Sequence, residues 1–301
     1  MISILIPTYN FNCLRLVTDL QQQCEEVQAQ FGAEVFSYEI IVADDAGTDE
    51  SIIEKNELIE LLPGCRYVRG EENVGRARVC NRLFDQAAYD FLLLIDADAE
   101  VCTDDFIQTY WQRREQADVL VGSIRTPDKA PTGHELRLKY EWAAEKIRTV
   151  EYRNEQPAAH FSTFNVMFAR KVIECHRFDE RCTEYGYEDA LLGLTITENG
   201  FSILHIENPL LHTGINSNKS FLGNSETALR TLAKLGEPMT LHAHVSVAHR
   251  RLQTYGWAGI FALFFSLFAP LLKKNLLSRH PSLLLFKLYK LGYYDRVVRQ
   301  H

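Results

Sequence analysis

Asp96 and Asp98 lie two positions apart, directly after the apolar run at 91–95. Carboxylates placed on one side of a chain repel each other, and each raises the pKa of the other. A divalent cation between them removes this conflict, and hard oxygen ligands suit Mg²⁺ or Mn²⁺, which also bind substrate phosphates. The pair therefore predicts a metal and phosphate site. The structural alternative is two strand-end acids that face water.

A second acidic pair, Asp44 and Asp45, follows the apolar segment at 38–43. A carboxylate at such a strand end can accept hydrogen bonds from a nucleobase or a ribose hydroxyl. The same residues begin the run DDAGTDES, which is typical of a turn that caps a helix. We expect one acid in each role.

Three further segments carry candidate ligands or bases. Asn73 and Arg76 lie at the start of a predicted helix, where a phosphate or base can bind. Glu188 and Asp189 begin another helix, where acids commonly interact only with the helix dipole, but one could act as a general base. His212 lies in the segment 208–214, which leaves a predicted strand toward the same edge of the sheet. It is a candidate third metal ligand that suits Mn²⁺ better than Mg²⁺, although a single histidine is more often structural.

Alternating strands and helices must position these residues. Apolar runs at 2–7, 38–45, 65–70, 90–96 and 118–122 alternate with segments of helical periodicity at 13–31, 75–88 and 104–117. Continuously apolar strands between helices predict an α/β fold with a mostly parallel sheet flanked by helices. Ligands of such sheets bind beyond the carboxyl ends of the strands, so the segments 7–10, 44–45 and 96–98 should meet at one edge.

Later segments continue the alternation. We expect a helix at 134–150, a strand that runs into a helix at 161–174, a helix at 188–200 and a strand at 201–206. Residues 1–216 are predicted to form one catalytic domain. Residues 217–301 are predicted to form a helical region that associates with a membrane.

Charge divides the chain in the same way. From Leu241 onward there are nine Lys or Arg and one acid, whereas the first 240 residues carry 23 Lys or Arg and 39 acids. The net charge of −8 argues against non-specific nucleic-acid binding. The seven cysteines form no C-x-x-C pair, which favours buried thiols in a reducing compartment. The first residues do not have the pattern of a secretory signal.

The segment 252–272 has no charged residue and is flanked by Arg250, Arg251, Lys273 and Lys274. It could span a bilayer, lie in the membrane surface, or pack in a soluble helical dimer or lid. The segment 281–294, with Lys287 and Lys290 among leucines and tyrosines, is typical of an interfacial helix attracted to anionic lipid. We favour peripheral, monotopic attachment to the cytoplasmic face of the cell membrane.

Six segments, taken in order, resemble the inverting glycosyltransferases of family 2, which have the GT-A fold. They are ISILIPTYN, IIVADDAGTDES, ENVGRARVCNR, FLLLIDADAEV, FDERCTEYGYEDALLG and PLLHTG, and they cover about residues 1–215. The resemblance implies a Rossmann-like nucleotide-binding domain, a nucleotide-sugar donor, usually UDP-linked, and a divalent metal, Mn²⁺ or Mg²⁺.

The resemblance also implies roles by position. Pro7, Tyr9, Asp44 or Asp45, Asn73 and Arg76 would hold the nucleotide. Asp96 and Asp98 would hold the nucleotide and the metal, with Asp98 as the direct ligand and His212 as a further metal ligand. Asp189 would be the catalytic base, with Glu188 beside it near the acceptor. Ala97 replaces a third acid found in many members. Residues 161–163 (Phe-Ser-Thr) replace small residues near the donor sugar, so the resemblance does not identify that sugar.

The expected function is transfer of a sugar to a hydroxyl of a glycan or lipid-linked acceptor, in cell-surface polysaccharide synthesis. One alternative is a sugar nucleotidyltransferase, which needs a glycine-rich loop after the first strand, where this chain has PTYNFN. A dehydrogenase would need G-x-G-x-x-G, which is absent. The other alternative is a non-catalytic nucleotide-sugar-binding or scaffold protein at the membrane.

Overall fold

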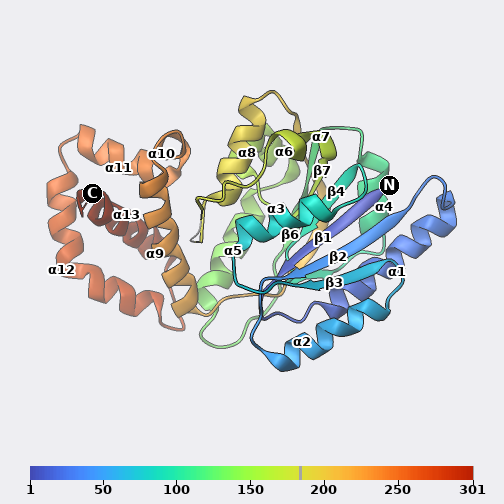
Figure 1. The fold of residues 1–301 in the computed structure, drawn as a ribbon. Coiled ribbons are helices and arrows are strands. Elements are labelled where there is room, and N and C mark those ends of the chain that lie inside the picture. Colours follow the sequence, from blue (N-terminus) through green and yellow to red (C-terminus); the bar gives the residue numbers. More distant parts are fainter. Residues whose placement is uncertain (183–184, 301) are drawn as a thin grey trace. The chain divides into compact units, whose positions relative to one another are not determined.

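The computed structural model describes residues 1–182 and 185–300 (Figure 1). Its contacts divide the chain into two compact units. The first consists of Met1–Thr126, Arg148–Thr183 and Asp189–Gly214, and the second of Pro127–Ile147, Glu184–Glu188 and Ile215–His301. Two segments of the expected catalytic domain thus group with the C-terminal helices. The division into domains 1–216 and 217–301 stays a prediction.

The first unit contains an eight-stranded sheet in the order β3-β2-β1-β4-β7-β6-β8-β5. Strands β1 to β4 pair in parallel, and so do β6 and β8. Strand β7 is antiparallel to both β4 and β6, and β5 is antiparallel to β8. The strands are β1 Ile2–Thr8, β2 Tyr38–Asp44, β3 Cys65–Arg69, β4 Phe91–Ile95, β5 Ala99–Val101, β6 Val119–Arg125, β7 Asn165–Ala169 and β8 Ile203–His212.

Helices cover both faces of this sheet, as the apolar strands predicted. Alternate residues of β1 point to opposite faces, so Ile4 packs with α1 and α4 while Leu5 packs with α3, α7 and α8. The elements of this unit are α1 Leu14–Phe31, α2 Glu50–Glu57, η1 Leu58–Leu61, α3 Arg76–Gln86, α4 Phe106–Arg113, α6 Val150–Glu155, η2 Pro157–His160, α7 Arg170–Cys175 and α8 Glu188–Glu198. The predicted α/β class is confirmed.

Two differences from the expected elements of this unit bear on the candidate site. The expected strand at 201–206 is longer and runs to His212, because β8 pairs with β6 along one edge and with β5 along the other. The three-residue strand β5 has no counterpart among the predicted elements. Its pairing brings Ala99 opposite His212 and so sets the position of the predicted metal ligands.

The second unit is helical, and α13 is its centre. Phe286, Tyr289, Tyr293 and Val297 share one buried side of α13 at helical spacing. The helices are α5 Glu135–Ile147, α9 Asn218–Leu235, α10 Met239–His242, α11 His244–Thr254, α12 Ala258–Leu276 and α13 Leu283–Gln300. Contacts join α13 to α5, α9, α11 and α12. Much of the apolar side of 281–294, expected at a lipid interface, therefore packs against other helices of this unit.

Candidate active site

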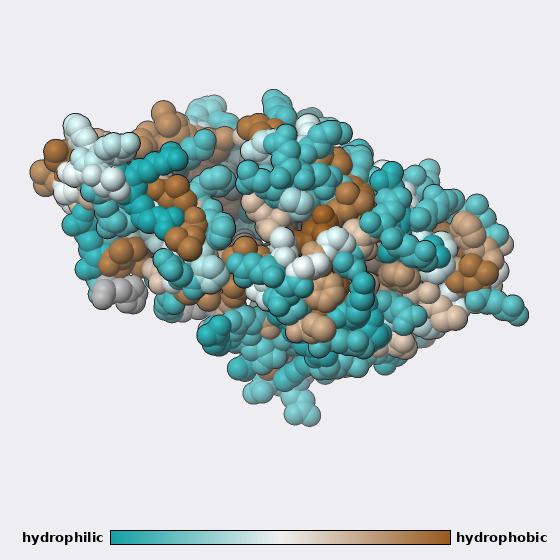
Figure 2. Space-filling view, turned by 90° about the horizontal axis from the view of Figure 1, so that it is seen from above, coloured by the Kyte–Doolittle hydropathy of each residue, from teal (hydrophilic) through white to brown (hydrophobic). Residues whose placement is uncertain are grey.

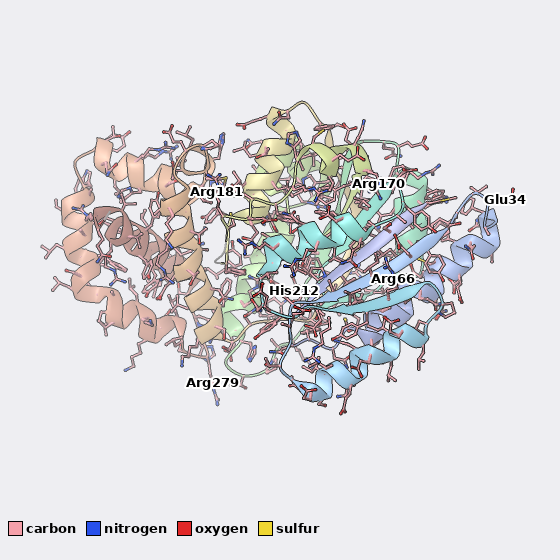
Figure 3. All side chains as sticks on the ribbon, viewed as in Figure 1. Glu34, Arg66, Arg170, Arg181, His212 and Arg279 are labelled. Carbon is pink, nitrogen blue, oxygen red and sulfur yellow. The ribbon has the colours of Figure 1, made fainter. Side chains whose placement is uncertain are left out.

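The turn between β4 and β5 presents Asp96 and Asp98 at the carboxyl end of β4. The amide of Asp96 donates to the Phe164 carbonyl at 3.0 Å, and the amide of Thr213 donates to the Asp98 carbonyl at 2.9 Å. The turn is therefore fixed to the loop before β7 and to the end of β8. In the view of Figure 3, His212 lies near the carboxyl ends of the parallel strands.

Asp98 and His212 form a pair. Asp98 Oδ2 lies 3.2 Å from His212 Nε2, and the Phe164 ring packs edge-on against the imidazole. The His212 side chain is 8% exposed, whereas that of Asp98 is 29% exposed, so a ligand can reach the carboxylate. The Asp98 carboxylate packs against Gly214 in space that a side chain would fill. A Cβ at residue 214 would lie 2.0 Å from Asp98 Oδ2.

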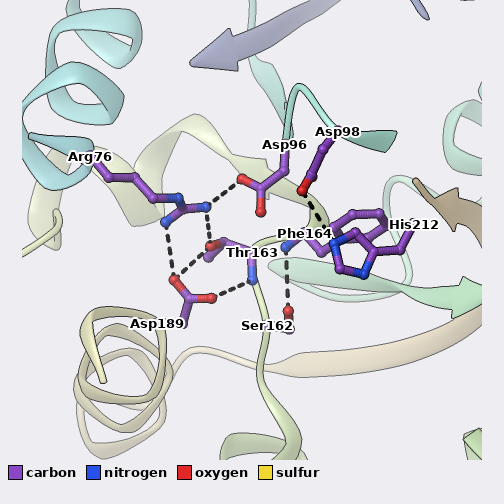
Figure 4. Close-up of polar contacts among 8 residues, drawn as sticks. All are labelled: Arg76, Asp96, Asp98, Ser162, Thr163, Phe164, Asp189 and His212. Atoms are coloured by element: carbon purple, nitrogen blue, oxygen red, sulfur yellow. Dashed lines mark hydrogen bonds and ion pairs between the residues drawn. The ribbon is translucent and has the colours of Figure 1, made fainter. Parts of the chain in front are cut away.

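Arg76, in the first turn of α3, joins three elements in a second polar group (Figure 4). Its Nη2 donates to Asp96 Oδ1 at 2.6 Å and to Thr163 Oγ1 at 2.8 Å, and its Nη1 donates to Asp189 Oδ1 at 3.2 Å. Burial raises the pKa of Asp96 to about 6, with the Arg76 charge opposing the shift and Asp98 adding to it. Each of the three ionic side chains keeps about 30% exposure, so the group remains open to a ligand.

Thr163 was not predicted as a site residue. Its hydroxyl donates to Asp189 Oδ1 at 2.7 Å, and its amide donates to Asp189 Oδ2 at 3.2 Å. The residue is fully buried. The only signal in the sequence is that Thr163 belongs to the segment at 161–163 that departs from the family pattern.

Asp44 and Asp45 are buried and bind protein groups. Asp44 accepts hydrogen bonds from the Gly47 amide at 2.9 Å and the Tyr67 hydroxyl at 2.6 Å. Asp45 accepts from the amides of residues 74 and 75, at 2.8 and 2.9 Å, and so fixes the loop that leads to Arg76. The expected helix cap is Asp49 instead, which accepts from the Ile52 amide. Nucleotide binding by Asp44 or Asp45 stays a prediction.

The remaining predicted residues lie outside these two groups. Pro7 lies near the end of β1, Tyr9 follows that strand and is 50% exposed, and Asn73 is exposed in the loop before α3. Glu188 belongs to the second unit, where its carboxylate accepts from the Gly186 amide at 2.8 Å. The structure thus brings together Arg76, Asp96, Asp98, Asp189 and His212, within the first unit.

The Asp98–His212 pair fits a cation that takes its other ligands from elsewhere. Within residues 1–182 and 185–300, no group of three or more His, Cys, Asp or Glu side chains has the arrangement of a metal site. A carboxylate and an imidazole suit Mn²⁺, and metals at phosphate-transfer sites complete their coordination with substrate phosphates and water. Asp96, whose Oδ1 is bound by Arg76, stays a predicted further ligand.

Comparison with family models identifies one family for this chain. The family model Glycosyl transferase family 2 matches residues 3–177. No curated protein matches the sequence significantly. Among solved structures, the mannosyltransferase PcManGT from Pyrobaculum calidifontis, in complex with GDP-Man and Mn²⁺, is similar with a TM-score of 0.54 and 15% identity. The aligned region covers 99% of this chain and 86% of that one.

TarS residues 1–349 from S. aureus are similar with a TM-score of 0.53 and 16% identity, covering 99% of this chain and 90% of that one. The same fragment in complex with UDP-GlcNAc is similar with a TM-score of 0.52 and 17% identity, and the coverage of both chains is the same. At this identity the likeness concerns the fold, and it confirms the predicted GT-A architecture. The family model spans more than half of the residues of this chain, and the chain therefore belongs to glycosyltransferase family 2.

Proposed function

We propose that this glycosyltransferase is metal-dependent and inverting, and that it transfers a sugar from a UDP-linked donor to a hydroxyl of a glycan or lipid-linked acceptor in cell-surface polysaccharide synthesis. The observation that carries the proposal is the position of Arg76, Asp96, Asp98, Asp189 and His212 at the carboxyl edge of the sheet. The complexes of PcManGT with GDP-Man and Mn²⁺ and of TarS with UDP-GlcNAc support a nucleotide-sugar donor.

In this proposal Asp189 acts on the acceptor, whereas Arg76, Asp98 and His212 act on the donor. The Asp189 carboxylate accepts the proton of the acceptor hydroxyl, whose oxygen attacks the anomeric carbon on the face opposite the leaving diphosphate. Arg76 donates to the diphosphate oxygens as negative charge develops on them. Asp98 and His212 would hold a divalent cation, which would supply positive charge to offset that of the diphosphate. One displacement inverts the anomeric configuration, and no covalent enzyme intermediate forms.

We expect nucleotide release from a sugar donor to depend on a divalent metal. The purified full chain would be incubated with UDP-, GDP- and dTDP-sugars and Mn²⁺ or Mg²⁺, and the released nucleotide would be measured. A UDP-sugar should give the highest rate, EDTA should abolish it, and Asp98→Ala should reduce it strongly. If no donor in this panel turns over and no nucleotide binds in a metal-dependent way, the proposal is wrong.

Thr163 is proposed as a positioning residue for Asp189. Thr163→Val keeps the shape of the side chain but removes the hydrogen bond to Asp189 Oδ1 and the acceptor for Arg76. We expect kcat to fall by about tenfold, a part of the 10²–10⁴-fold that a general base contributes. Thr163→Ser keeps the hydroxyl and should restore most of kcat. A loss in Thr163→Ser without one in Thr163→Val would show that the methyl group, and hence packing, is what matters.

The C-terminal region is proposed to hold the enzyme at the cytoplasmic face of the cell membrane. Among the described residues, α12 is the helix that is long and apolar enough to cross a bilayer by length and composition. Length and composition do not separate a span from a helix in the membrane surface.

A further inference from the structure

Helix α12 has two apolar faces. Phe265, Leu272 and Leu276 are buried on one of them. On the other, Ile260, Leu263, Leu267 and Leu271 are each more than 60% exposed, and Phe264 and Phe268 are about 40% exposed. Spacings of three and four residues place these six side chains in one stripe, called here the outer stripe of α12. Figure 2 shows hydrophobic side chains on the surface of the C-terminal helices, at the left of the view.

Basic residues flank the outer stripe at both ends of α12, and one of them, Lys273, also lies 3.5 Å from Glu226. Arg250 and Arg251 precede α12, and Lys273 and Lys274 lie in its last turn. The only acid after residue 240 is Asp295, which is 3% exposed and binds His249 at 2.9 Å and Arg299 at 2.8 Å. Within 241–300, exposed charge is therefore positive. An apolar surface with a basic border complements a bilayer that carries anionic lipid.

The packing of α12 against α13 decides between a span and a surface helix. The Phe265 ring lies against the backbone of Gly292, since a Cβ at residue 292 would lie 2.1 Å from the ring. Along the same helix α13 carries Lys287, Lys290, Arg296 and Arg299. If α12 spanned the membrane, these charges would be drawn toward hydrocarbon, where charged side chains are unfavourable. An orientation in the membrane plane keeps them in water or among headgroups.

The turn between α11 and α12 offers a site for a headgroup. Tyr255 and Trp257 are 74% and 58% exposed there, as aromatic residues at membrane interfaces are. They border a cavity of about 370 Å³ that is also lined by His244, Arg251 and Leu252. Arginine binds phosphate through paired N–H donors, so Arg251 lies where a lipid phosphate can be held next to apolar side chains.

We propose that the outer stripe of α12 inserts into the surface of an anionic bilayer, with α12 in the membrane plane and a lipid phosphate held by Arg251. The inference deepens the membrane attachment in the proposed function. The glycosyl donor plays no part in it, so vesicle binding and nucleotide release test the two proposals separately.

The test is co-sedimentation of the full chain with vesicles of phosphatidylglycerol and phosphatidylcholine, compared with phosphatidylcholine alone. We expect strong binding to the anionic vesicles, weakened by salt. Leu263→Ser with Leu267→Ser should reduce binding at least about tenfold, because two inserting side chains are lost. Arg251→Gln should reduce binding most to anionic vesicles, because their net negative charge adds to the phosphate contact that phosphatidylcholine also offers. Emission of Trp257 should shift to shorter wavelength on binding, and Trp257→Phe should remove that shift.

Matched controls come from the first unit. Leu61 is 76% exposed and Arg15 has a 76% exposed side chain, so Leu61→Ser and Arg15→Gln repeat the same chemical changes elsewhere on the surface. Both should bind vesicles like the unaltered chain. The proposal fails if the folded chain does not bind anionic vesicles or if the double serine variant binds equally well. It also fails if the outer stripe proves to be the contact of a stable homodimer, seen as a halved mass in the serine variant.

Discussion

Asp189→Asn is expected to lower kcat by about 10²–10⁴-fold, the usual contribution of a general base, while the dissociation constant of the donor changes little. The amide has nearly the shape of the carboxylate, and its oxygen can still accept from Arg76 and from the Thr163 hydroxyl. It cannot take the proton of the acceptor. The loss should therefore appear in the chemical step and leave donor binding intact.

The measurement is product formation at saturating donor and acceptor, together with calorimetric binding of the donor nucleotide. Asp85→Asn is the matched control, because Asp85 is an exposed acid of the same unit that pairs with Arg177 at 2.6 Å. Full turnover by Asp189→Asn would exclude Asp189 as the base. Loss of donor binding together with turnover would assign Asp189 to the donor site.

The sequence alone predicts the part of the fold that repeats in a regular way. Strands β1 to β4 alternate with helices, and β1, β2 and β4 are largely apolar, so their parallel pairing and the edge where they end follow from the sequence pattern. Strand β5 has three residues, too few for any periodicity, and forms only because β8 lies beside it. The antiparallel direction of β7 depends on where the chain returns after α5 and α6, which no local signal indicates.

The candidate site divides in the same manner. Asp96, Asp98, Asp189 and His212 belong to segments whose order resembles a family, so the sequence singles them out. The part played by Thr163 follows from the loop before β7, which brings its hydroxyl between Arg76 and Asp189. These contacts join residues that are far apart in the chain, so no local sequence pattern predicts them.

For Asp44 and Asp45 the sequence predicts the position of each side chain but not its binding partner. Their positions at the end of β2 were expected, but a carboxylate at a strand end can bind a ligand or the protein's own amides. Loop geometry decides between the two, and here it brings the amides of Gly47 and Gly75 to these carboxylates. In α13, likewise, periodicity identifies an apolar face, and only the fold shows that other helices cover it.

Gly214→Ala is expected to impair the metal and donor site as severely as removal of the Asp98 carboxylate. An added Cβ would lie 2.0, 2.6 and 2.7 Å from Oδ2, Cγ and Cβ of Asp98. The backbone cannot yield easily, because both the amide and the hydroxyl of Thr213 donate to the Asp98 carbonyl, at 2.9 and 2.8 Å. The Asp98 side chain must therefore rotate away from His212.

We expect Gly214→Ala to weaken Mn²⁺-dependent nucleotide binding by about 10–100-fold, the loss usual for disturbed metal sites, while thermal unfolding shows a folded protein. Gly223→Ala is the control, since a Cβ there meets nothing within 4 Å. The sharper test is a double-mutant cycle. If the methyl group acts only by displacing Asp98, adding Gly214→Ala to Asp98→Ala should cost almost nothing further, because the carboxylate it displaces is already gone. Additive losses would mean that Gly214 acts through another part of the site, and unchanged binding in Gly214→Ala would remove Asp98 from the metal site altogether.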